Sequence, residues 1–112
     1  MKKYLKTTLI SSVLAASAAV VSASADTIKI GFNVPLTGFA AADGQSALHG
    51  AELAVSQVNG AGGVNGSMLE LVVYDDQASP KESGPLAVKM ITKDSVVAGI
   101  SGSYSGATRA AA

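Results

Sequence analysis

Three segments of the chain have the hydrophobic spacing of β-strands. From residue 27 to 33, apolar side chains alternate with polar or small ones, which predicts a strand with one apolar face. Residues 68–74 form a second apolar run, and Glu70 within it favours a position at a sheet edge. Residues 96–100 are small or apolar at every position, which is typical of a strand covered on both faces. We therefore expect this third strand to lie centrally in its sheet.

Helical spacing fills the intervals between these strands. From residue 42 to 59, apolar side chains recur every three or four positions, and the opposite face is polar. Asn59-Gly60 predicts a left-handed cap at the end of this helix. Ser79 to Glu82 has the form of a capping box, with proline at the first helical position. Pro85 then predicts either a kink or a new helix start, with the helix running to Thr92.

The predicted element order is β-α-β-α-β, followed by the start of a third helix near Ser105. Such alternation predicts an α/β fold, an open parallel sheet with right-handed crossovers and flanking helices. Three strands and a third helix of about two turns do not complete such a sheet. We therefore expect residues 26–112 to be the first part of a larger lobe.

The first 25 residues are predicted to be a secretory signal peptide. The basic start, Met1 to Lys6, precedes an apolar stretch over residues 7–22, and Ala23-Ser24-Ala25 forms a cleavage site. A membrane anchor is the alternative, but this stretch is shorter than a spanning helix and is diluted by Ser and Thr. We expect cleavage after Ala25 and a periplasmic location.

Charge and cysteine content narrow the classes of partner. The chain has eight basic and eight acidic residues, and three of the basic ones (Lys2, Lys3 and Lys6) lie in the signal segment. Five basic and eight acidic residues remain from 26 to 112, a net charge of −3 with no basic footprint for nucleic acid. The absence of cysteine excludes disulfides and thiolate metal ligands. We predict no nucleic-acid partner, no metal and no cofactor.

Three further features offer little for catalysis. The Gly-rich run 60–66 follows a helix and precedes a strand, the reverse of a phosphate-binding loop, so it predicts a plain turn. Asp75 and Asp76 are adjacent on an extended chain and point to opposite sides, which favours a solvated turn or a hinge contact. His49, the only histidine, lies on the polar helix face. We predict no catalytic residue and a binding protein rather than an enzyme.

The predicted binding site lies at the carboxyl ends of the strands. With the strand order 2-1-3, a ligand of an open α/β sheet binds between the first and third strands. The walls of this crevice are the loops 33–44 and 101–108. The second loop offers hydroxyl groups, glycines that allow close backbone approach, and a helix start suited to a carboxylate or phosphate. The candidate ligand-binding residues in these loops are Phe39, Ser103, Tyr104, Ser105 and Gly106.

Some of these residues have a second interpretation. Phe39 and Tyr104 form either an aromatic wall for an apolar or planar ligand, or simple packing over the first helix and its loop. Ser105 is a helix N-cap, a ligand contact, or both, because the cap lies next to the free amides.

The chain also resembles a known family. The PLTG turn, the helix ending in N-x-x-G-G-x-x-G, the D-D-x-x-S-P motif and the Ser/Gly loop occur in order and at fitting spacing. Together they resemble solute-binding proteins of the branched-chain amino-acid (leucine/isoleucine/valine-binding) type. The resemblance implies two α/β lobes joined by a hinge, which close on a small ligand and deliver it to the membrane permease of an ABC importer.

The resemblance also implies roles for particular residues. The family grips the ligand carboxylate with the loop after the third strand, which corresponds here to Ser105 and Gly106, or to Gly102-Ser103 in a second alignment. Thr108 is the next expected contact. Asp43 stands where the family often has a bulky aromatic residue, so it meets an amine or amide of the ligand or caps the first helix. The expected ligand is therefore an amino acid, an amide or an aromatic acid.

Two other classes of protein fit the same residues. One is the extracellular ligand-sensing domain of a receptor with this fold. The other is an exported α/β enzyme that uses the Ser/Gly loop for an anion.

Overall fold

The computed structural model describes residues 26–102 and 104–112, so the predicted signal peptide lies outside the described residues. The order of strands and α-helices is the one that the sequence predicts, and a short 3₁₀ helix that it does not predict precedes the first α-helix. The elements are β1 (Ile28–Val34), a short 3₁₀ helix η1 (Gly38–Ala40), α1 (Ala41–Gly60), β2 (Leu69–Asp75), α2 (Pro80–Thr92), β3 (Ala98–Ser101) and α3 (Ser105–Ala111).

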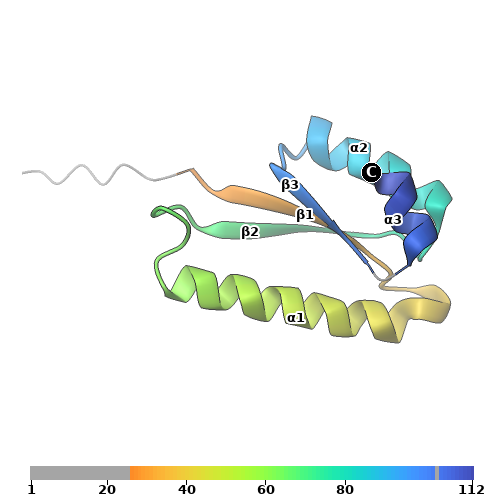
Figure 1. Ribbon diagram of the computed structural model, residues 1–112, viewed down its shortest axis with the longest axis horizontal. Helices are drawn as coiled ribbons and strands as arrows, with labels where there is room; N and C mark the ends of the chain where they lie inside the picture. The colour runs from red at the N-terminus through yellow and green to blue at the C-terminus, as the bar shows by residue number, and fades with distance from the viewer. Residues whose placement is uncertain (1–25, 103) are drawn as a thin grey trace, which may run out of the picture.

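The strands form one parallel sheet in the order β2-β1-β3. Figure 1 shows α1 along one face of this sheet and α2 with α3 along the other. The α/β prediction, an open parallel sheet with flanking helices, is therefore confirmed.

β1 is the buried centre of the sheet, and its two faces serve different helices. Phe32 and Val34, which are 3% and 0% exposed, occupy one face. On the other face, a Cβ added to Gly31 would lie 2.6 Å from the Met90 sulfur of α2, so the strand packs closely beneath that helix. The alternation along residues 27–33 thus directs alternate residues of β1 to the α1 face and to the α2 face of the sheet.

The prediction of a central third strand is wrong for the described residues. β3 pairs there with β1 alone and forms one edge of the sheet. Val97 and Ile100 beside and within it are 71% and 48% exposed. The apolar pattern of residues 96–100 predicts cover on both faces, and no element of the described chain supplies that cover on the α1 side of Ile100.

The end of α1 has the predicted type of cap at a different glycine. The helix includes Gly60, and the left-handed residue is Gly62, with φ of 102°. The Gly62 amide donates to Asn59 O at 3.0 Å and the Gly63 amide donates to Val58 O at 2.9 Å, which is a Schellman motif. The rest of the Gly-rich run is a turn, as predicted, closed by a Val64–Ser67 bridge.

α2 is continuous through Pro85, so the alternative of a new helix start there is wrong. Proline at residue 80 opens the helix as predicted, but the Ser79 side chain makes no capping hydrogen bond. Instead the Ser79 carbonyl accepts the first helical amides, from Glu82 at 3.2 Å and Ser83 at 2.9 Å. The carbonyl that Pro85 leaves unpaired belongs to exposed Lys81, where water can satisfy it.

Candidate functional site

The two predicted ligand loops meet at the carboxyl ends of β1 and β3. Asn33 and Ser101 are register partners there, and the Gly102 amide donates to Asn33 O at 2.8 Å. A Cβ on Gly102 would lie 3.1 Å from the Pro35 ring, so a glycine lets the two loops approach this closely. The sheet order therefore brings residues that are far apart in sequence to one end of the fold.

Three of the candidate side chains form a cluster on these loops. The rings of Phe39 and Tyr104 meet edge to face, with centroids 5.5 Å apart. The Tyr104 hydroxyl donates to Asp43 Oδ2 at 2.8 Å. Phe39 is 82% exposed, so the apolar surface of this pair is open to a partner. We call Phe39, Asp43 and Tyr104 the loop cluster.

The acid of the loop cluster also shifts the pKa of the tyrosine. The hydrogen bond to Asp43, with some burial and the negative charge of that carboxylate, raises the pKa of Tyr104 above its ordinary value. The phenol, which is protonated at neutral pH in any case, therefore loses its proton only at a higher pH than an ordinary tyrosine, and its hydroxyl occupies one acceptor site of Asp43. An ionised carboxylate has further acceptor sites, so Asp43 can also meet a donor of a ligand.

The start of α3 differs from the prediction in one respect. The helix begins at Ser105 and its N-cap residue is Tyr104, with no side-chain capping hydrogen bond, so the N-cap interpretation of Ser105 is wrong. Ser105 and Gly106 are exposed. A Cβ on Gly106 would lie 3.3 Å from the Pro80 ring, so this glycine keeps the start of α3 close to α2. Ser103 lies outside the described residues.

Thr108 supports the loop from within α3. Its hydroxyl lies 3.0 Å from Gly102 O and 3.1 Å from Tyr104 O, both of which accept its proton. The side chain therefore folds the loop back over the first turn of the helix. Its oxygen retains acceptor capacity for a ligand donor.

Asp75 joins β2 to the first ligand loop, a role that the sequence does not predict in detail. Its Oδ1 accepts amide protons from Leu36 at 2.8 Å, Thr37 at 3.4 Å and Gln77 at 3.0 Å. Its Oδ2 accepts the Thr37 hydroxyl. Burial by itself would raise the pKa of this carboxyl, but the hydrogen bonds from Thr37, Leu36 and Gln77 outweigh burial, and the pKa of Asp75 lies below its ordinary value.

This low pKa predicts how the loop responds to acid. A carboxyl with a depressed folded-state pKa contributes its full stabilisation above its ordinary value of 3.8, and loses it as the pH falls through the lower folded-state value. We expect the Leu36 and Thr37 amide signals to stay constant from neutral pH to that range and to shift together with the Asp75 carboxyl below it. An NMR titration of carboxyl and amide signals measures this. A midpoint for Asp75 at or above 3.8 would contradict the prediction.

Asp76, the neighbour of Asp75, is buried, so the prediction of a solvated turn is wrong at this position. It is 1% exposed, and its Oδ1 accepts the Ala78 amide at 3.0 Å. Its Oδ2 accepts the Ser83 hydroxyl at 3.1 Å. The Asn33 amide group then donates to Ser83 O at 2.9 Å and to Ser83 Oγ at 3.2 Å. This chain of hydrogen bonds ties the end of β2 to α2 and to β1.

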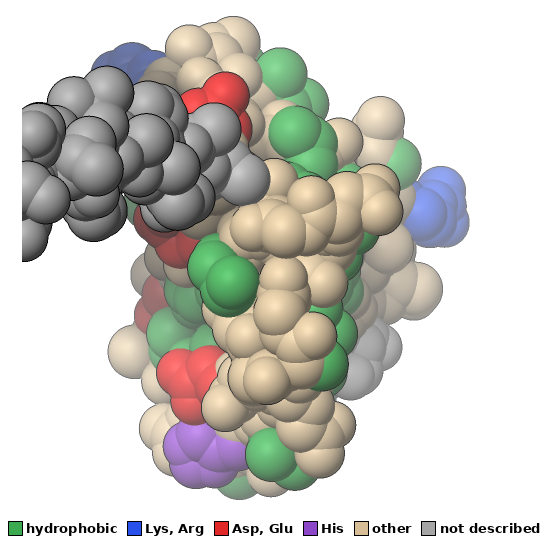
Figure 2. Space-filling view, turned by 90° about the vertical axis from the view of Figure 1, so that its left-hand side faces the viewer, with side chains coloured by type: hydrophobic (Ala, Val, Ile, Leu, Met, Phe, Trp, Pro, Cys, Tyr) green, Lys and Arg blue, Asp and Glu red, His purple; other side chains and the backbone are tan. Residues whose placement is uncertain are grey.

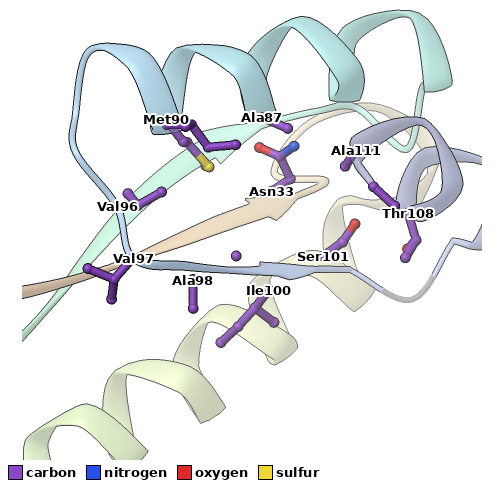
Figure 3. A pocket seen from close by; sticks show the side chains of 13 residues that line it. Asn33, Ala87, Met90, Val96, Val97, Ala98, Ile100, Ser101, Thr108 and Ala111 are labelled. Carbon is purple, nitrogen blue, oxygen red and sulfur yellow. The ribbon is translucent and has the colours of Figure 1, made fainter.

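A groove opens beside this network, between β3, α2 and α3 (Figure 3). Figure 3 shows the Asn33 amide and the Ser101 hydroxyl on the same side of the sheet, facing the helices. Within the described residues, Asn33 Oδ1 and Ser101 Oγ are buried without a hydrogen-bond partner. Of the predicted site residues only Thr108 lines this groove, so the groove and the loop cluster are separate features.

Basic side chains do not gather on the face of the molecule that Figure 2 presents. Figure 2 shows lysine and arginine side chains separated from one another on the face it presents. His49 is exposed, as predicted.

Among residues 26–102 and 104–112, no group of three or more His, Cys, Asp or Glu side chains is placed to hold a metal ion. No helix in the same residues is both long and apolar enough to cross a membrane.

The chain forms an α/β lobe with an open parallel sheet, and polar and aromatic loops lie at the carboxyl ends of two neighbouring strands, where open α/β sheets commonly bind ligands. Residues 27–112 match the model of the periplasmic binding protein family. The chain therefore belongs to this family of solute-binding proteins.

Curated relatives and solved structures agree with this assignment. A leucine-, isoleucine-, valine-, threonine- and alanine-binding protein of Pseudomonas aeruginosa is 47% identical over 70 residues, 62% of this chain and 19% of the relative. The Leu/Ile/Val-binding protein homolog 2 of Brucella abortus is 42% identical over 64 residues, 57% of this chain and 17% of the relative. The chain thus matches about a fifth of the length of these relatives.

Two solved structures share the fold and contain different ligands. One is the branched-chain amino acid transporter substrate-binding protein of Streptococcus pneumoniae in complex with isoleucine, with a TM-score of 0.73 and 40% identity over 76% of this chain and 24% of that one. The other is a solute-binding protein of an ABC transporter from Rhodopseudomonas palustris in complex with 3,4-dihydroxybenzoic acid. Its TM-score is 0.70, with 30% identity over 77% of this chain and 23% of that one.

Proposed function

We propose that this chain forms part of the substrate-binding component of an ABC importer, which captures a small carboxylate ligand in the periplasm and passes it to a membrane permease. The single observation that carries the proposal is the meeting of the two loops at the ends of β1 and β3, with the loop cluster beside the start of α3. In this proposal residues 1–25 are a cleaved signal peptide. Residues 26–112 are the N-terminal part of the first lobe.

The proposed ligand has a carboxylate at one end and an apolar or planar body. The exposed Ser105 hydroxyl and the backbone amides of Ser105 and Gly106 are donors suited to the carboxylate. The Phe39–Tyr104 pair offers an apolar surface to the body, and Asp43 offers an acceptor to an amine or amide. Isoleucine and 3,4-dihydroxybenzoic acid, found in the two solved relatives, both combine a carboxylate with such a body.

The test is isothermal titration of the chain with L-isoleucine and with 3,4-dihydroxybenzoate, comparing the native chain with Ser105→Ala. Loss of a hydrogen bond to a charged group costs about 1.5–3 kcal/mol, so we expect Ser105→Ala to weaken the better ligand by about tenfold or more. Ser56→Ala, at an exposed position of α1, is the matched control and should leave the affinity unchanged. An unaltered affinity for Ser105→Ala would remove this residue from the site.

A further inference from the structure

We infer that Asp75 is a positioning residue of the proposed ligand site, which holds the loop after β1 so that Phe39 faces Tyr104. The inference rests on the proposed function, because it assigns Asp75 a role in the proposed ligand site. The contacts of Asp75 themselves are present without a ligand. Asp75 is the last residue of β2 and pairs in register with Val34 at the end of β1. Its carboxylate therefore lies directly beside the chain as it leaves β1.

The contacts of the carboxylate fix the point where the loop turns. The Leu36 and Thr37 amides and the Thr37 hydroxyl all donate to it, across a sequence separation of 38 or 39 residues. Thr37 is the N-cap residue of η1, yet its side chain makes no capping hydrogen bond to that helix. The hydroxyl is instead committed to Asp75, so the carboxylate determines where η1 begins.

The loop needs this anchor because the packing of Phe39 does not hold it. Phe39 lies on η1 two residues after Thr37 and is 82% exposed. Gly38, between them, has a φ of 78°. Because glycine adopts many other backbone conformations at little cost, Gly38 by itself does not fix the direction of the loop. Ala40, 1% exposed, anchors the far side of η1, and Asp75 anchors the near side. The Phe39–Tyr104 contact is thus set by two fixed points, one of which is the Asp75 carboxylate.

The backbone after β2 also depends on Asp75. Gln77 and Ala78 both have positive φ, 54° and 56°, which costs free energy in residues other than glycine. The Gln77 amide is held by Asp75 Oδ1 and the Ala78 amide by Asp76 Oδ1. The paired acids therefore keep a strained turn in place directly after β2, and the Asp75 carboxylate contacts this turn and the ligand loop at once.

The test compares Asp75→Asn with a matched control, Asp94→Asn, in the full chain. Asp94 also accepts a side-chain hydrogen bond, from the Tyr74 hydroxyl at 3.0 Å, but it contacts neither ligand loop. Two quantities are measured, the hydrogen-exchange rates of the Leu36, Thr37 and Gln77 amides and the affinity for L-isoleucine and 3,4-dihydroxybenzoate. Because charge-assisted hydrogen bonds are about twice as strong as neutral ones, we expect Asp75→Asn to raise these exchange rates and to weaken the better ligand, each about tenfold. Exchange along β1 should stay unchanged, and Asp94→Asn should change neither quantity.

Variants of Thr37 provide a milder version of the same test. Thr37→Val removes the hydroxyl while keeping the shape of the side chain, so it should reproduce part of both effects even if Asp75→Asn does not fold. Thr37→Ser restores the hydroxyl and should restore both quantities. Native exchange rates at Leu36 and Thr37 in Asp75→Asn, or in Thr37→Val if that variant alone folds, would overturn the inference.

The two quantities separate this inference from the proposed function. If the native chain binds neither probe, the proposed function fails for these ligands, while the exchange rates still decide whether Asp75 holds the loop. If the native chain binds a probe and Asp75→Asn speeds exchange without weakening binding, the positioning role is overturned and the ligand site stands.

Discussion

Replacing Gly44 with alanine is expected to destabilise the chain by about 3 kcal/mol, the upper part of the usual range for overpacking a tight site. A Cβ at this position would overlap the Pro35 carbonyl oxygen and would lie 2.5 Å from the carbonyl carbon. Both are backbone atoms, so no change of rotamer relieves the clash. Either α1 or the loop after β1 has to move, and each carries part of the proposed site.

Gly50→Ala is the matched control for this prediction, because it makes the same change in the same helix. Nothing lies within 4 Å of a Cβ at Gly50. Alanine there should stabilise the helix by about 0.5–1 kcal/mol, the usual difference from glycine in a helix interior. Urea unfolding followed by circular dichroism measures both variants. Similar midpoints for the two would show that the contact between Gly44 and Pro35 is not tight in solution.

Gly44→Ala is also expected to change the pKa of Tyr104 in the loop cluster. Gly44 follows Asp43, whose carboxylate accepts the Tyr104 hydroxyl. A shift of the start of α1 relative to Pro35 therefore moves Asp43 relative to Tyr104 and disturbs their hydrogen bond. We expect the tyrosine pKa to fall back toward its ordinary value in whatever fraction of Gly44→Ala remains folded, since the hydrogen bond to Asp43 is its main cause.

Local periodicity is sufficient to predict most of this fold. Strands and helices differ in the spacing of their apolar residues, and that signal lies within each segment. The helix over residues 42–59 was predicted within one residue at each end, and the parallel sheet followed from the alternation of elements. The errors arise where neighbours in space decide the outcome. Gly60 and Gly62 are equally able to end a helix, and the turn geometry selects Gly62.

The candidate site shows a similar division. The two loops were predicted to meet because the strand order places them at one edge, and Phe39, Asp43 and Tyr104 do come together there. The role of Asp75 could not be predicted from local spacing, because its partners Leu36 and Thr37 lie 39 and 38 residues away. Asp76 contacts the nearer Ser83, but its burial depends on how α2 packs on the sheet, which local spacing does not give. A signal was nevertheless present. Asp75 ends the strand that pairs with β1, so it lies next to the loop that follows β1. That loop contains Thr37, whose hydroxyl can donate to a neighbouring acid.

Replacing Ser83 with alanine is the second prediction with a large effect, a loss of about 2–3 kcal/mol, the cost of leaving a buried charged group without its hydrogen bond. Ser83 is 0% exposed, and its hydroxyl is the only donor to Asp76 Oδ2 within the described residues. Ser83 Oγ in turn accepts a hydrogen bond from the Asn33 amide group. Alanine removes the link between an acid and an amide that are 1% and 2% exposed, where water has little access to replace it.

Ser46→Ala is the matched control, because Ser46 is also a helical serine with a hydrogen-bonded hydroxyl. That hydroxyl donates to Ala42 O at 2.9 Å on the exposed surface of α1. Water replaces such a bond, and alanine is the better helix former, so the stability should change by less than about 0.5 kcal/mol. Urea midpoints of the two variants compare the buried and exposed hydroxyls directly. If Ser83→Ala were as stable as Ser46→Ala, Asp76 would have another donor in solution, and the link from β2 through α2 to β1 would not depend on Ser83.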